Sequence, residues 1–251
     1  MMYRLIYATI LPILLFNLYK TTFLKVNSPS QNIKVSDIPP PDGFFRKQAD
    51  SGTFGAWLRQ ISLKHDNTVY LYNGTMKRNQ QAHFAVLDIR TGKKDLQQCA
   101  DAVIRLRAEF LYGLSSYGDI IFYDNLKRAY VFQPPYNRDN FEKYLEKVFT
   151  WCGTMSLEKQ LKPISNYADI EAGDVFIRGG SPGHAVIVID IAVNSRNEKV
   201  FMMAQSYMPA QDIHIILNPN NSMQGPWYSL PQKDLLITPE WVFHKKERKR
   251  W

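Results

Sequence analysis

The sequence predicts an α+β domain in which one long helix packs against an antiparallel sheet. Residues 173–190 hold two apolar runs separated by glycine, serine and proline, which is the pattern of an antiparallel hairpin. Two further apolar runs, at 199–205 and 212–217, predict the next strands, and residues 95–111 are rich in helix-forming residues. With 251 residues, 45% of them hydrophobic, the chain can bury a substantial core.

The N-terminal residues predict export. One early positive charge, Arg4, precedes an apolar run that is shorter than the roughly 20 residues of a membrane-spanning helix. We therefore expect a signal peptide or an uncleaved membrane anchor at 1–20, a linker at 21–41, one domain at 42–244 and a basic tail at 245–251. The expected location is the periplasm or cell envelope; of the two alternatives, only an uncleaved segment would hold the chain at the inner membrane.

The net charge of +8 is concentrated partly in the predicted tail. A basic chain end is usually solvated, and the sequence has no nucleic-acid-binding motif, so we expect no nucleic-acid partner. A basic surface would instead favour contact with an anionic cell wall.

The remaining elements can be placed in chain order. Helices are expected at 95–111, 139–151 and 156–161, and additional strands at 68–72, 83–89, 119–123 and 129–132. Residues 54–63 are expected to form a short helix or an extended segment, and residues 238–243 a last strand or a packing clasp. Asp95 is expected to cap the helix at 95–111. Cys99, Val103 and Phe110 share one face of that helix, so the cysteine should point toward the core one turn after the helix begins.

Three residues from separate elements form a candidate catalytic set. Cys99 lies near a helix start, His184 opens a strand and Gln205 ends the next strand. A helix N-terminus and a nearby imidazolium both lower the pKa of a thiol from about 8.5, which favours the nucleophilic thiolate. His184 would act as the base and Gln205 would orient its ring.

Several segments resemble known families. Residues 99–103, 172–176, 184–188 and 201–206 are similar to the cysteine helix, the Gly-Asp strand, the His strand and the third strand of NlpC-type and CHAP-type cell-wall peptidases and amidases. That resemblance implies a papain-like core with inserted helices, cleavage of an amide bond in peptidoglycan or a peptide, and catalysis by Cys99, His184 and Gln205. Residues 95–102, 179–185 and 204–211 more closely resemble an uncharacterised bacterial domain of unknown function, which implies no activity.

The sequence departs from the peptidase pattern around the nucleophile. Those enzymes usually carry Asp-Cys-Ser or Asp-Cys-Gly, whereas this chain has Gln98 and Ala100 beside Cys99. The oxyanion donors are therefore expected to be the Cys99 amide with the side chain of Gln97 or Gln98.

Five residues are predicted to bind substrate around the histidine. The glycines of the hairpin turn are expected to leave space beside the His184 ring. The predicted substrate-binding residues are Gln98, Gly180, Ser181, Gly183 and Tyr207.

Other roles for these residues stay open. The alternatives for Cys99 are a small apolar residue of the core and a disulfide with Cys152 in an oxidising compartment. No cofactor or metal is expected, because the histidines lack metalloprotease spacing, and Asp190 and Asp212 are expected to be solvated.

Two functional hypotheses follow. The first is an exported cysteine hydrolase, or an acyltransferase with the same Cys-His pair. The second is a non-catalytic cell-envelope binding module of the same fold. The substrate and the oligomeric state are left open.

Overall fold

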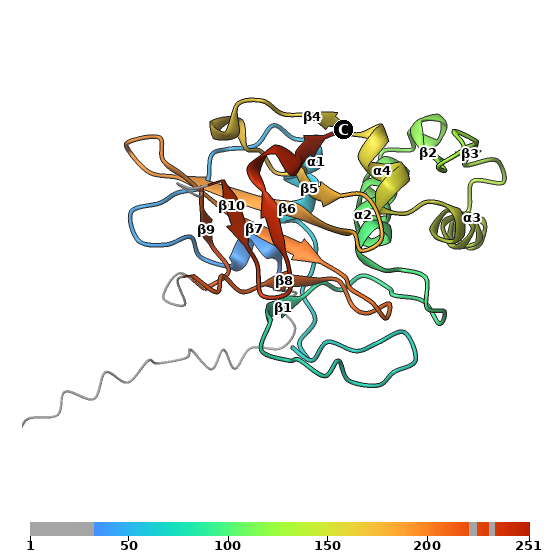
Figure 1. The fold of residues 1–251 in the computed structure, drawn as a ribbon, viewed down its shortest axis with the longest axis horizontal. Helices are drawn as coiled ribbons and strands as arrows, with labels where there is room; N and C mark the ends of the chain where they lie inside the picture. Colours follow the sequence, from blue (N-terminus) through green and yellow to red (C-terminus); the bar gives the residue numbers. More distant parts are fainter. Residues whose placement is uncertain (1–32, 221–224, 231–233) are drawn as a thin grey trace, which may run out of the picture. The chain divides into compact units, whose positions relative to one another are not determined.

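A large antiparallel sheet organises the domain (Figure 1). The computed structural model describes residues 33–220, 225–230 and 234–251, which belong to a unit spanning 32–251. The predicted signal or anchor at 1–20 lies outside these residues. Within the described ranges, no helix is both long enough and apolar enough to cross a membrane.

The main sheet has eight strands, and all of its pairings are antiparallel. Its strands, in spatial order, are β1 (His83–Val86), β8 (His214–Ile216), β7 (Lys199–Gln205), β6 (His184–Val193), β5 (Val175–Arg178), β12 (Arg248–Arg250) and β4 (Lys162–Pro163), and β9 (Tyr228–Ser229) pairs with β7. The predicted α+β class with an antiparallel sheet is confirmed.

The central strands are apolar on both faces because both faces are covered. Alternate residues of β6, such as Ile187 and Ile189, enter one core cluster, whereas Val186 and Val188 enter another. The register of the β5–β6 hairpin pairs Arg178 with His184. The histidine therefore begins its strand at the turn, as predicted.

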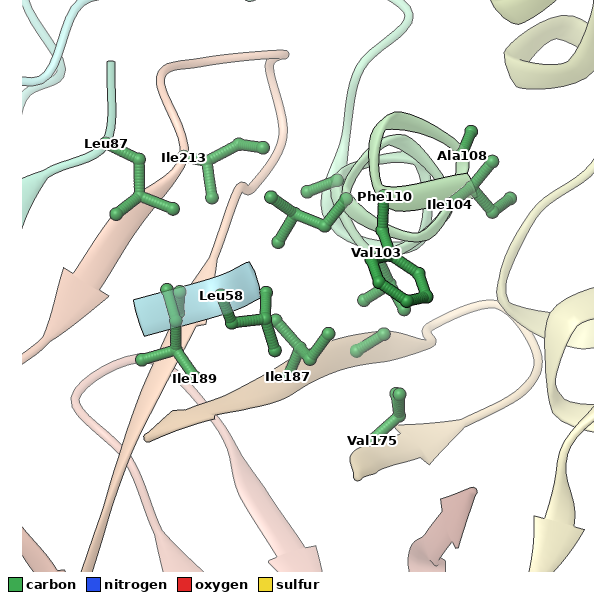
Figure 2. Close-up of a cluster of buried hydrophobic side chains, with 14 of the residues drawn as sticks. Leu58, Leu87, Val103, Ile104, Ala108, Phe110, Val175, Ile187, Ile189 and Ile213 are labelled. Atoms are coloured by element: carbon green, nitrogen blue, oxygen red, sulfur yellow. The ribbon is translucent and has the colours of Figure 1, made fainter. Parts of the chain in front are cut away.

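Helices cover the first face of the sheet. Val103 and Phe110 of α2 (Cys99–Gly113) lie over Val175 and Ile187 (Figure 2). Leu58 of α1 (Phe54–Arg59) packs into the same hydrophobic cluster. The other helices are α3 (Arg138–Trp151) and α4 (Thr154–Gln160), and short 3-10 helices lie at Val35–Asp37, Tyr117–Asp119, Tyr167–Asp169 and Lys245–Glu247. A small hairpin, β2 (Ile121–Tyr123) and β3 (Ala129–Val131), matches its prediction.

A second hairpin covers the opposite face. It consists of β10 (Leu235–Ile237) and β11 (Val242–His244), and its Leu236 and Phe243 pack on the sheet residues Phe176 and Phe201. The expected strand at 238–243 is thus shifted toward the C-terminus. The expected strand at 68–72 forms only isolated bridges, Tyr70 to Met76 and Leu71 to Gln211.

The domain boundaries are wider than expected at both ends. Residues 245–251 are not a solvated tail, because β12 lies between β5 and β4 and Arg248 is fully buried. Arg250 donates from Nε to Oδ1 of buried Asp174 at 2.5 Å, so the basic residues are compensated inside the fold. At the other end, the Val35 amide donates to the Ile61 carbonyl at 3.0 Å, so residues before 42 also belong to the domain.

The two aspartates expected to be solvated are buried. Asp190 accepts hydrogen bonds from Nε of Arg46 and Nε of Arg59, each at 2.5 Å. Asp212 accepts from Nζ of Lys64 at 2.8 Å. The prediction failed because the compensating cations come from segments more than 130 residues away, which local sequence does not reveal.

Candidate functional site

His184 and Gln205 meet at one end of the sheet. Nε2 of His184 lies 2.8 Å from Oε1 of Gln205, and both side chains are buried. Since an amide oxygen can only accept, Nε2 carries the proton and donates, which leaves Nδ1 of the neutral ring as a free base. The predicted orienting contact is therefore present.

A buried ion pair fixes the Gln205 amide. Its Nε2 donates to Oε2 of Glu240 at 2.7 Å, and Nζ of Lys77 donates to the same oxygen at 2.7 Å. A carboxylate accepts but does not donate, so the amide nitrogen must face Glu240 and the amide oxygen must face His184. Sequence analysis missed Glu240 and Lys77, since 163 residues separate them and neither belongs to a motif.

Cys99 is the first residue of α2 and lies against the start of β6. Asp95 is not the helix cap; the Gln98 amide donates to Oδ2 of Asp101 at 3.1 Å, so the helix begins at Cys99. The backbone amides of Ala100, Ala185 and Cys99 itself favour the thiolate. Because Ala185 directly follows His184, the thiol lies at the histidine end of the strand.

The thiol is nevertheless neutral at pH 7. Burial, followed by the charge of Asp101, raises the pKa of Cys99 to about 11, and the helix start and amides only partly oppose this. The predicted lowering of this pKa is thus wrong: the residue is 6% exposed, and loss of hydration outweighs the helix end.

The imidazole is neutral as well. Burial lowers the pKa of His184 to about 4, the Gln205 hydrogen bond acts in the opposite direction, and the charge of Lys77 lowers it further. Its ring lies 4.8 Å from the Tyr207 ring and 5.3 Å from the Trp241 ring, measured between centroids. The resting pair is therefore a neutral thiol and a neutral imidazole, sheltered by aromatic rings.

Two glycines of the β5–β6 turn lie close to α4, while space for a substrate beside the His184 ring stays a prediction. A Cβ on Gly183 would lie 2.5 Å from Oγ1 of Thr154, and one on Gly179 would lie 2.5 Å from Oε2 of Glu158. These glycines therefore let α4 pack against the turn. Gly180, with a φ of +136°, has looser surroundings, since its nearest contact would be the Pro182 carbonyl at 3.6 Å.

The other predicted substrate residues differ in accessibility. Ser181 is exposed, and Tyr207 and Gln98 are half-buried. Gln98 donates from Nε2 to Oδ1 of Asp95 at 3.1 Å. Gln97 is fully buried, and its Oε1 accepts from Nε of Arg105 at 2.9 Å. Its Nε2 is a buried donor with no hydrogen-bond partner among the described residues, so Gln97 stays a candidate oxyanion donor beside Gln98.

The disulfide alternative is contradicted, because Cys99 and Cys152 are both free thiols. Burial raises the pKa of Cys152 to about 12. Within the described part of the chain, no group of three His, Cys, Asp or Glu side chains is arranged to hold a metal ion. Nδ1 of His214 lies 2.9 Å from the Asp212 carbonyl, and Nε2 of His83 lies 2.6 Å from the Asn67 carbonyl.

Fold and site together define an α+β protein with a buried His-Gln pair at one end of an antiparallel sheet and a buried cysteine beside the start of the same strand. The chain belongs to the family described as "Domain of unknown function (4846)", whose model matches residues 35–133 and 124–250. The expected membership of an uncharacterised domain family is thus confirmed. No curated protein and no solved structure matches the chain.

Proposed function

We propose that this chain is a papain-like cysteine hydrolase that cleaves an amide bond with Cys99 as nucleophile, His184 as base and Gln205 as orienting residue. The observation that carries the proposal is the 2.8 Å contact between His184 and Gln205, which leaves Nδ1 of His184 unprotonated. The similarity of these segments to NlpC-type and CHAP-type peptidases supports the same roles.

The chemistry follows from the neutral pair. Nδ1 of His184 takes the thiol proton as Sγ of Cys99 attacks the carbonyl carbon, and the resulting imidazolium protonates the departing amine as the C–N bond breaks. Water then attacks the thioester, giving one proton to His184, which returns it to Sγ as the C–S bond breaks. The products are an amine, a carboxylic acid and the free thiol.

Local amides support the charged steps. The amides of Ala100 and Ala185 stabilise the thiolate as it forms, and the start of α2 adds a favourable dipole. The Cys99 amide would supply one oxyanion donor. The second would be Nε2 of Gln97, which has no partner among the described residues, or Nε2 of Gln98 once it leaves Asp95. Since Cys99 and His184 are neutral at rest, attack and proton transfer occur together.

The proposed substrate is a peptide or the peptide part of peptidoglycan. The sequence of residues 1–20 supports export to the periplasm or cell envelope, where that substrate would be met. Ser181 is exposed and the half-buried Tyr207 ring lies against His184, and both are proposed to contact the substrate together with Gln98 and Gly180. Gly183 is proposed only to shape the turn.

A non-catalytic envelope-binding module is the second candidate. Its support is the resting state of the pair, because a thiol with a pKa of about 11 is a poor nucleophile unless the substrate changes its surroundings. In that case the same end of the sheet would bind a wall fragment without cleaving it.

The decisive experiment measures release of soluble fragments from purified peptidoglycan by the full chain. We expect release that is abolished in Cys99→Ala and in His184→Ala, and retained in the matched cysteine control Cys152→Ala. Added amine nucleophiles that appear in the product would indicate acyl transfer. Binding to peptidoglycan without fragment release, equal in wild type and Cys99→Ala, would establish the binding module instead.

A further inference from the structure

A pocket lies toward the C-terminal end of β6, away from the cysteine. Its volume is about 570 Å³, within the usual range for small-molecule sites. Ile191 of β6 lines it, seven residues from His184, which is roughly 23 Å along an extended strand. The pocket is also lined by α1 and by the chain end, which lie near one another in Figure 1.

Arg107 of α2 is the unusual group in this pocket. Its guanidinium lies over three aromatic rings, 5.2 Å from the centroid of Phe54, 5.4 Å from Phe110 and 5.5 Å from Trp251. Among the described residues, it has no hydrogen-bonded or ion-paired partner. Burial lowers its pKa, and the nearby charge of Asp119 partly opposes this.

The rings fix the orientation of the guanidinium without using its N–H groups. Stacking occupies the faces of the planar group, while carboxylates and phosphates bind along its N–H edge. A guanidinium that is already oriented loses less conformational freedom when such a group binds. Arg107 is therefore preorganised for an oxyanion.

Two lysines add positive charge that is not paired with a carboxylate in the part of the chain that the structure describes. Nζ of Lys199 donates to the carbonyls of Ala168 and Ile170, at 2.8 and 3.2 Å. Lys47 also lines the pocket and has no ion pair within the described ranges. Both lysines can turn toward a bound anion at small cost, because neither leaves a carboxylate behind.

Most of the other charged side chains of the pocket are already ion-paired within the protein. Arg59 is paired with Asp190, and Arg250 is paired with Glu171 at 2.9 Å. Asp50 is the acidic lining residue that has no ion pair among the described residues. Among the described lining residues, three cationic side chains without an ion pair (Arg107, Lys199 and Lys47) thus stand against one such carboxylate (Asp50).

We propose that this pocket binds a small molecule bearing a carboxylate or phosphate group, which pairs with the N–H edge of Arg107 and with Lys199 and Lys47. The apolar part of the ligand would contact Phe54 and Trp251, whose indole N–H is buried and has no partner among the described residues. The proposal is independent of the cysteine chemistry.

Calorimetric titration of the full chain at low ionic strength, with inorganic phosphate and separately with acetate, tests this site. We expect saturable binding of one anion per chain, weakened about tenfold or more in Arg107→Gln, which corresponds to the loss of a charged hydrogen bond. Lys199→Gln should weaken binding severalfold. The matched control is Arg90→Gln, because Arg90 is exposed and does not line the pocket.

The outcomes separate the ligand classes. Preference for phosphate indicates a phosphate-bearing ligand, and preference for acetate indicates a carboxylate-bearing ligand. If Arg107→Gln unfolds by circular dichroism, Arg107→Lys replaces it, since lysine keeps the charge but loses the fork and should still bind more weakly. Absence of saturable binding of either anion, or equal affinity in Arg107→Lys and Arg90→Gln, would overturn the proposal.

Discussion

Acidification should destabilise the protein through His184. Burial lowers its pKa to about 4, whereas the unfolded chain has a histidine pKa of about 6.5. Between these values the unfolded state binds more protons than the folded state, so stability falls as pH falls through this window and is unaffected above it. At 1.36 kcal/mol per pKa unit, His184 alone should remove about 3 kcal/mol of stability between pH 7 and pH 4. The His184 side chain is 1% exposed, so solvent screens its charge very little in the folded state.

Urea unfolding at pH 7 and pH 4 measures this effect. Wild type should lose more stability than His184→Gln, and the difference between their losses should be about 3 kcal/mol. His214, whose pKa burial lowers to about 3, remains in both proteins and contributes to both losses. The control His65→Gln removes an exposed histidine and should follow wild type. Equal losses in wild type and His184→Gln would refute the burial of a neutral imidazole at this site.

Three further predictions concern the surroundings of the site. Gly183→Ala should lower the free energy of unfolding by about 2 kcal/mol or more, because the new Cβ would lie 2.5 Å from Oγ1 of Thr154 and 2.6 Å from a backbone carbonyl. The control is Gly118→Ala, whose new Cβ would have no neighbour within 4 Å. Equal melting temperatures of the two variants would contradict this packing. Burial raises the pKa of Asp101 well above its usual range, so its effect on Cys99 is tested at pH 9, where ionisation of the carboxyl is favoured. There Asp101→Asn should lower the pKa of Cys99 by removing a neighbouring negative charge, and iodoacetamide alkylation should accelerate; an unchanged or slower rate would argue against this coupling. Glu240→Gln should reduce kcat on the identified substrate by about tenfold, because the orienting amide can then flip; an unchanged kcat would remove Glu240 from the positioning role.

Local sequence was sufficient for the central elements of the fold. The β5–β6 hairpin and β7 are apolar on both faces and bounded by turn residues, so their positions follow from hydrophobic pattern and turn chemistry alone. The start of α2 was misplaced because Asp95 has the chemistry of a cap. The actual cap depends on the Asp101 side chain turning back to the Gln98 amide, which the sequence pattern alone did not single out.

Long-range charge compensation explains what the sequence did not reveal. The strand β12 consists of Arg248, Lys249 and Arg250, a composition typical of a solvated chain end. It enters the sheet because buried Asp174 lies where Arg250 can reach it. For the same reason, the hydrogen bond between Gln205 and Glu240 could not be predicted from local sequence, since the partners of a buried polar group come from the tertiary fold.

The relay behind the histidine bears on the choice between the two proposed functions. Lys77, Glu240, Gln205 and His184 form a continuous chain of three hydrogen bonds, at 2.7, 2.7 and 2.8 Å. Burying these polar groups costs desolvation energy that an apolar side chain of similar volume would avoid. A module that only needs a filled core gains nothing from fixing the tautomer of a buried imidazole. A base that must present an unprotonated Nδ1 toward a thiol requires that tautomer, so the relay supports the hydrolase.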